Sequence, residues 1–116
     1  MILTVLALGG TILGATTIAG LLMLYQLRQS TDLANSAKAI FAADAGLEYA
    51  FYNLFCVDNP EKPNCPALAP IFQNQASHSV TCYDAAAAPI ECGEGTRTIH
   101  SVGMAGGASR AFEAAF

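Results

Sequence analysis

The sequence predicts an α+β protein with one long N-terminal helix, at about residues 1–55, and a small C-terminal head built on a three-stranded antiparallel sheet. Residues 1–27 are apolar and contain no Asp, Glu, Lys or Arg, and helical periodicity continues from there to Phe55. Short β-rich segments separated by turn residues then occupy the second half of the chain. Of the 116 residues 53% are hydrophobic and only 12% are charged, which fits one apolar helix joined to one small polar domain.

The apolar segment, residues 1–27, is long enough to span a bilayer, because a span needs about 20 apolar residues. A secretory signal peptide would place basic residues before a shorter apolar run that ends at a cleavage site. No Lys or Arg precedes this run. We therefore expect either an unusual membrane anchor or, as the favoured interpretation, a processed N-terminus at Met1 from which a basic leader has been removed.

Small residues recur along this segment at helical spacing. Gly10 and Gly14 form a GxxxG motif, and small residues four apart continue the pattern up to Gly20. Such faces let apolar helices approach one another closely, although Gly and Ala are also common in membrane helices that do not associate. The pattern is thus compatible with helix association and with simple membrane insertion.

Residues 28–56 are predicted to continue the helix as an amphipathic segment that packs on the head. No proline occurs between Arg28 and Phe55. One apolar face is expected from side chains mostly three or four residues apart, namely Leu33, Ala37, Ile40, Leu47, Phe51 and Leu54. A helix of 55 residues would be roughly 80 Å long, so lipid or other chains must cover its N-terminal half. The run Asp58-Asn59-Pro60 is expected to end it.

Residues 57–116 are predicted to form the head. Four of the five prolines lie in residues 57–76, which are expected to form an irregular loop. The strand candidates are His78–Tyr83, Thr96–Met104 and Ser109–Phe116, the last two joined by a turn at Ala105-Gly106-Gly107-Ala108.

The four cysteines predict disulfides and an oxidising compartment, because a head of this size gains from covalent cross-links. Three pairings are possible. We favour Cys56–Cys65 with Cys82–Cys92, since each closes a loop of about ten residues. A zinc site would need close pairs such as CxxC, which the sequence lacks.

The remaining chemistry indicates neither an enzyme nor a nucleic-acid-binding protein. The net charge is −4 and the five Lys and Arg are dispersed. His78 and His100 lie on two strand candidates and would be structural neighbours if those strands pair, while Asp44 and Glu48 are interpreted as a helix-surface pair of acids. No nucleophile elbow or phosphate-binding loop occurs. We expect no catalytic residue, no metal and no cofactor.

One stretch has a more specific pattern. Residues 37–53 read AKAIFAADAGLEYAFYN, which resembles the FxADxGxExALY stretch of bacterial type IV pilins and pseudopilins. The end of the chain, residues 99–103 and 109–113, is similar to the closing strands of that family. The resemblance covers about the first 55 and the last 20 residues.

The resemblance implies a pilin-like fold and a subunit of a type IV pilus-like helical filament, displayed at the cell surface and drawn from a pool in the cytoplasmic membrane. A prepilin peptidase would cleave before Met1. The first residue of the mature chain is often N-methylated in the family, so Met1 would be the methylated position here. The inner-membrane pilus assembly machinery would then assemble copies of the chain. Gly14 and Gly20 would mark the part of the helix that melts in the filament. Expected filament-core packing residues are Val5, Gly9, Gly10, Gly14, Ala15, Ala19 and Gly20.

The chain departs from the family at two positions. Met1 replaces the usual aromatic first residue, and Val5 stands where the family has Glu. Assembly register would then come from packing, or from a polar group such as Thr4 or Thr11. The alternative function is a single-span membrane-anchored extracytoplasmic binding module, or a minor tip pilin that presents the head to a ligand.

Overall fold

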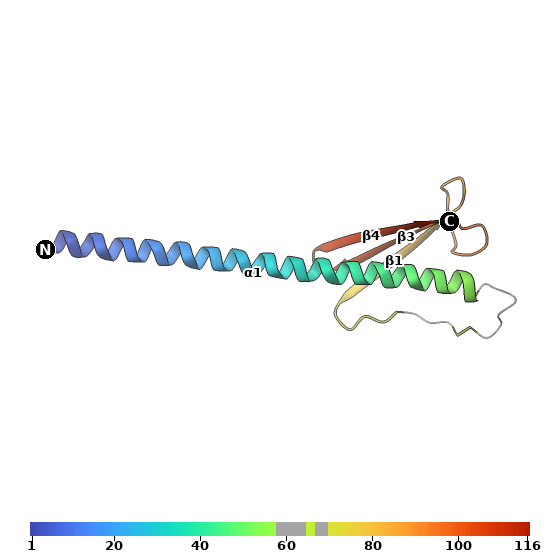
Figure 1. Ribbon diagram of the computed structural model, residues 1–116, viewed down its shortest axis with the longest axis horizontal. Coiled ribbons are helices and arrows are strands. Elements are labelled where there is room, and N and C mark those ends of the chain that lie inside the picture. The colour runs from blue at the N-terminus through green and yellow to red at the C-terminus, as the bar shows by residue number, and fades with distance from the viewer. Residues whose placement is uncertain (58–64, 67–69) are drawn as a thin grey trace. The chain divides into compact units, whose positions relative to one another are not determined.

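The computed structural model describes residues 1–57, 65–66 and 70–116 (Figure 1). The chain forms helix α1 (Ile2–Tyr52), a single π-helical turn η1 (Asn53–Val57), and four strands. The strands are β1 (Ala76–Tyr83), β2 (Pro89–Ile90), β3 (Thr98–Ala105) and β4 (Ala108–Ala115). This arrangement confirms the predicted α+β fold of one long N-terminal helix followed by a small antiparallel sheet. The residues expected to stop the helix, 58–60, lie outside the described part of the chain.

The chain divides into two compact units, Met1–Leu33 and Ala34–Phe116, and α1 contributes to both. The first unit consists of the N-terminal part of α1. The second contains the rest of α1, η1 and all four strands. The polarity of the sequence changes slightly earlier, at Arg28, so the second unit begins inside the segment predicted to be amphipathic.

The sheet has the strand order β2-β1-β3-β4, and every neighbouring pair is antiparallel. Gly106 and Gly107 join β3 to β4, as the sequence predicted, and Gly106 has φ 56°, a conformation that glycine adopts without strain. The sheet has four strands where three were expected. The additional strand, β2, is only two residues long and pairs with the end of β1, and so short a segment carries no alternation that could predict it.

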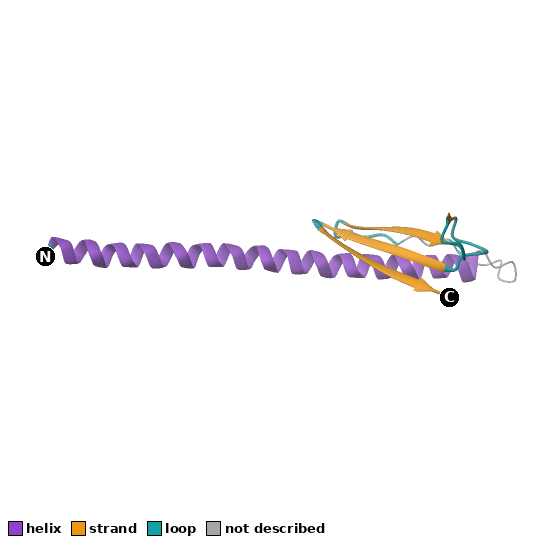
Figure 2. Ribbon diagram, turned by 90° about the horizontal axis from the view of Figure 1, so that it is seen from above, coloured by secondary structure: helices purple, strands orange, loops and turns teal. Residues whose placement is uncertain are grey.

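In both views the sheet lies against one side of the C-terminal part of α1 (Figures 1 and 2). On α1 the residues buried by this contact are all small: Ala39, Ala42, Ala43, Gly46 and Ala50. Gly103 of β3 faces them so closely that a Cβ at this position would come within 3.0 Å of the backbone of Ala39 and Ala43. At Gly103 helix and sheet therefore meet backbone to backbone, with little side-chain volume between them.

This close contact corrects the predicted face of the helix. Leu33, Ala37 and Ile40 are exposed, and Leu47, Phe51 and Leu54 are only half-buried. The physical reason is steric, because bulky side chains do not fit where the sheet approaches the helix backbone. They lie on the flank of the contact instead, where Leu47 and Phe51 pack beside a core formed by Ala50, Cys82 and Ile99.

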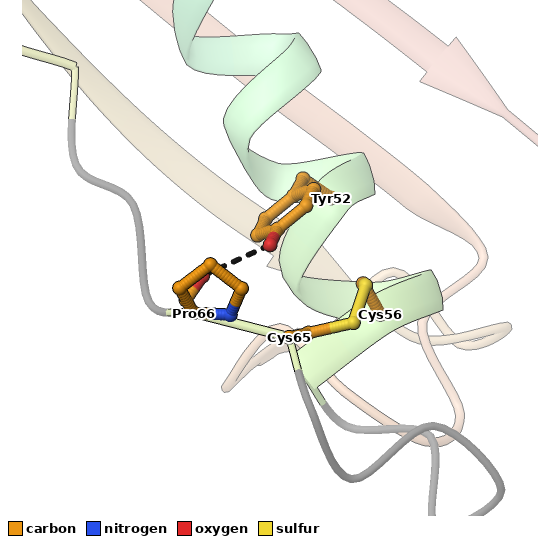
Figure 3. Close-up of a disulfide and its surroundings, with 4 residues drawn as sticks. All are labelled: Tyr52, Cys56, Cys65 and Pro66. Carbon is orange, nitrogen blue, oxygen red and sulfur yellow. Dashed lines mark hydrogen bonds between the residues drawn. A yellow bond between two sulfur atoms is a disulfide. The ribbon is translucent and has the colours of Figure 1, made fainter.

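Two disulfides cross-link the head, and they are the pairings that loop length favoured. Cys82 is completely buried and is bonded to Cys92, which fixes the β1–β2 connection to the core. Cys56 in η1 is bonded to Cys65, and the Tyr52 hydroxyl donates a hydrogen bond of 2.9 Å to the carbonyl of Pro66 (Figure 3). The end of the helical segment is thus tied to the chain that leads toward β1. Half of the predicted proline-rich loop, residues 58–64 and 67–69, lies outside the described residues.

Candidate functional site

The first unit is unusual because its large apolar side chains are exposed. All fifteen large apolar residues from Met1 to Leu27 are at least 59% exposed. Burying one such side chain stabilises a structure by about 1.5–3 kcal/mol, so leaving all of them in water would be strongly unfavourable. We call this set the N-terminal apolar surface, and no described residue of the chain covers it.

The threonine hydroxyls among these apolar side chains are satisfied by the helix. Each of these hydroxyls donates a hydrogen bond to a carbonyl three or four residues earlier, over 2.7–3.1 Å; these residues are Thr4, Thr11, Thr16 and Thr17. A hydroxyl bonded in this way carries no unpaired donor into an apolar environment. The surface is therefore compatible with lipid or with another apolar helix. Thr4 and Thr11, the candidates for setting assembly register, use their donors within their own helix.

The glycines of the first unit have room around them. A Cβ added at Gly9, Gly10, Gly14 or Gly20 would meet no described atom within 4 Å outside the local helix. Packing within the single chain therefore gives no reason for glycine at these positions, although each costs about 1 kcal/mol in a helix interior relative to Ala. In the single chain α1 is helical through Gly14 and Gly20, and loss of helical order there in an assembly stays a prediction.

By length and composition α1 is able to cross a membrane, and none of its apolar window is buried. The core helix of a soluble protein would meet the same criterion, but such a helix is mostly covered by its own chain. Here Val5 and the other predicted packing residues are exposed.

The helical part of the second unit adds exposed apolar side chains that periodicity did not single out as a contact surface. Phe41 is 72% exposed and Phe55 is 59% exposed, both on the helical segment. The ring of Phe55 stacks on Phe51, with centroids 6.0 Å apart, and also contacts Phe116 at the end of the chain. Their exposure could be recognised only once the small-residue face was known to be the one against the sheet.

The two histidines are not neighbours, which corrects the expectation for paired strands. His78 lies opposite Gly103 and faces α1, whereas His100 lies opposite Thr81 and faces away from it. The reason is the register, which aligns even-numbered residues of β1 with odd-numbered residues of β3. His78 packs edge-on against Tyr49 and Phe72. Asp44 and Glu48 are exposed on α1, as a helix-surface pair would be.

Within the part of the chain that the structure describes, no group of three His, Cys, Asp or Glu side chains is placed to hold a metal ion. Comparisons with protein-family models, with curated proteins and with solved structures found no match for the chain. The long apolar helix and the small antiparallel sheet are consistent with a pilin-like fold. The case for function therefore rests on the physical chemistry of this chain.

Proposed function

We propose that the protein is a structural subunit of a type IV pilus-like helical filament and polymerises through its N-terminal apolar surface. The observation that carries this proposal is the exposure of that surface together with the internal hydrogen bonding of its threonines. A surface of this kind can be covered by a bilayer or by copies of itself. The same segment thus serves as a membrane anchor before assembly and as the filament core afterwards.

The small residues support association over permanent anchoring. Gly10, Gly14 and Gly20 reduce the stability of an isolated helix, and the single chain gains no packing from them. Close approach of neighbouring helices would compensate for this cost through van der Waals contact. The proposal includes cleavage before Met1 by a prepilin peptidase, export by an inner-membrane pilus assembly machinery, and a cell-surface filament.

Register in this proposal comes from shape, because Val5 supplies no carboxylate to pair with the N-terminal amine of a neighbour. The grooves left by the glycines and the ridges of the large side chains between them would fix how far one helix slides along another. The exposed Phe41 and Phe55 of the second unit are proposed to add contacts between copies outside the filament core.

Substitution at Gly14 tests the proposal. Gly14→Leu is expected to abolish filaments, because a leucine side chain would prevent close helix approach, while Gly14→Ala is expected to retain them. Both changes favour the helix intrinsically, so loss of filaments in Gly14→Leu could not be ascribed to a weakened helix. The measurement is filament yield by electron microscopy, with near-UV circular dichroism as the check that the head stays folded. Wild-type filament yield from Gly14→Leu would refute close packing at this position.

A further inference from the structure

The face of the sheet that points away from α1 carries a hollow of about 480 Å³ with both polar and apolar lining. Cys82 and Ile99 are packed against α1, so alternation along the strands sends the side chains of Tyr83, Thr98 and His100 to the opposite face. A volume of this size falls within the roughly 300–1,000 Å³ typical of small-molecule sites. Six side chains define its chemistry: Tyr83, Asp84, Arg97, Thr98, His100 and Glu113.

The hollow combines donors, acceptors and an aromatic ring. Arg97 offers only donors, Asp84 and Glu113 offer only acceptors when ionised, and His100 offers both. His100 of β3 lies directly opposite Glu113 of β4 in the sheet register. Tyr83 at the end of β1 contributes a ring with an apolar face.

The rim of the hollow is held in place by backbone hydrogen bonds. The Asp84 Oδ1 atom accepts bonds from the amides of Ala86 and Ala88, at 2.8 and 2.9 Å, which leaves its second oxygen for other partners. The Arg97 amide donates to the Tyr83 carbonyl at 2.8 Å, and the Phe116 amide donates to the Arg97 carbonyl at 3.0 Å.

Two further constraints hold the segments on either side of the hollow. The Cys82–Cys92 disulfide ties the end of β1 to the chain after β2, and a turn from Gly93 to Thr96, closed by two hydrogen bonds of 3.1 Å, leads directly into Arg97. A site fixed in this way loses little conformational entropy when a ligand binds.

The charges restrict the class of ligand. An anion would meet the carboxylates of Asp84 and Glu113, and a cation would meet the guanidinium of Arg97. A neutral molecule with several hydroxyls offers a donor to each carboxylate and an acceptor to the guanidinium, while the apolar face of its ring can lie on Tyr83. We propose that this hollow is a binding site for a neutral saccharide unit.

The proposed site does not depend on assembly, because all of its residues belong to the second unit and lie on the sheet face away from α1. In a filament the site would recur in every copy. Weak binding by one copy would then become strong attachment to a surface that displays many sugars.

The test is a titration of the full ¹⁵N-labelled chain in dodecylphosphocholine micelles, a detergent without a sugar headgroup. The probes are glucose, galactose, N-acetylglucosamine and N-acetylgalactosamine, followed by their β-linked disaccharides. We expect saturable shifts of the amides of Ala86, Ala88 and His100 with at least one probe. Ser77, at the other end of the outer face of β1, should not respond.

Arg97→Gln and Glu113→Gln should each weaken binding about tenfold, as loss of a charge-assisted hydrogen bond implies. Ser77→Ala is the matched control and should leave the affinity unchanged. Both charged side chains are exposed; if Arg97→Gln should fail to fold, Glu113→Gln decides. Absence of saturation with every sugar, unchanged affinity in both variants, or equal binding of sulfate or lysine would overturn the proposal.

Discussion

Replacing Gly103 with alanine is expected to destabilise the head more than any other single methyl addition to a glycine of the described structure. The added Cβ would lie within 3.0 Å of the backbone oxygen of Ala39 and the backbone nitrogen of Ala43. Neither atom can rotate away, because both belong to a regular helix. The sheet and the helix would have to separate, which would loosen the buried contacts on both sides of β3.

Overpacking of a core costs about 1–3 kcal/mol, and occasionally more. Because backbone atoms are involved here, we expect about 3 kcal/mol. A domain of this size loses about 4–8 °C in Tm per kcal/mol, so the transition should fall by about 12–24 °C. The signal to follow is near-UV circular dichroism of the tyrosines, since three of the four lie in the second unit: Tyr49, Tyr52 and Tyr83. The far-UV signal would be dominated by α1.

Gly107→Ala is the matched control in the same sheet. A Cβ at Gly107 would meet no described atom within 4 Å, so its effect should stay within about 0.5 kcal/mol. If Gly103→Ala unfolded at the same temperature as Gly107→Ala, the backbone-to-backbone contact between α1 and β3 would be refuted.

Four further variants test other contacts of the second unit. Gly46→Ala should cost less than Gly103→Ala, because the new Cβ would meet side-chain atoms and not backbone, namely the Ser101 Oγ at 2.5 Å and the His78 Cδ2 at 2.8 Å, and because alanine favours the helix by about 1 kcal/mol. It should still destabilise the head, since Ser101 is buried and can move only by giving up its hydrogen bond to the Ala43 carbonyl; thermal denaturation of both variants checks this. Ser101→Ala should cost about 1 kcal/mol in urea denaturation by removing the buried 2.7 Å hydrogen bond to the Ala43 carbonyl, and an unchanged midpoint would contradict it. Removing either disulfide by paired alanine substitution should cost about 2–3 kcal/mol of unfolding free energy. Cys82→Ala/Cys92→Ala should be about 1 kcal/mol more destabilising than Cys56→Ala/Cys65→Ala, because Cys82 is completely buried in the core. Equal midpoints of the two double variants in urea denaturation would show that the buried sulfur adds nothing.

Much of the fold could be predicted because its signals are long or local. A charge-free apolar segment followed by continued helical periodicity indicated α1, and the Gly106-Gly107 pair indicated the turn between β3 and β4. The strand candidate Ser109–Phe116 corresponds to β4, and Phe116 at its end contacts Phe51 of the helix. In these cases local preference and the final structure agree.

The parts that could not be predicted depend on contacts distant in the sequence. Hydrophobic periodicity gives weight to bulky residues, and so it selected the flank that contains Ile40 and Phe51. The face against the sheet is Ala39, Ala42 and Gly46, because β3 presents a glycine there. Nothing local in the helix reveals the position of Gly103.

The register of the strands could not be predicted from the sequence either. The alignment of Val80 with Ser101 sends His78 and His100 to opposite faces, and a shift of one residue would have reversed that result. The hollow on the outer face of the sheet follows from the same kind of register, because His100 and Glu113 lie opposite each other only when β3 and β4 are aligned as they are.

The most direct test of the central claim is helical reconstruction by electron microscopy of the native assembly sheared from cells. The proposal predicts a filament in which the apolar surfaces of residues 1–27 from neighbouring copies pack against one another along the axis, with the sheets outside. Particles that disperse in mild detergent, or a filament in which residues 1–27 make no contact between copies, would contradict it.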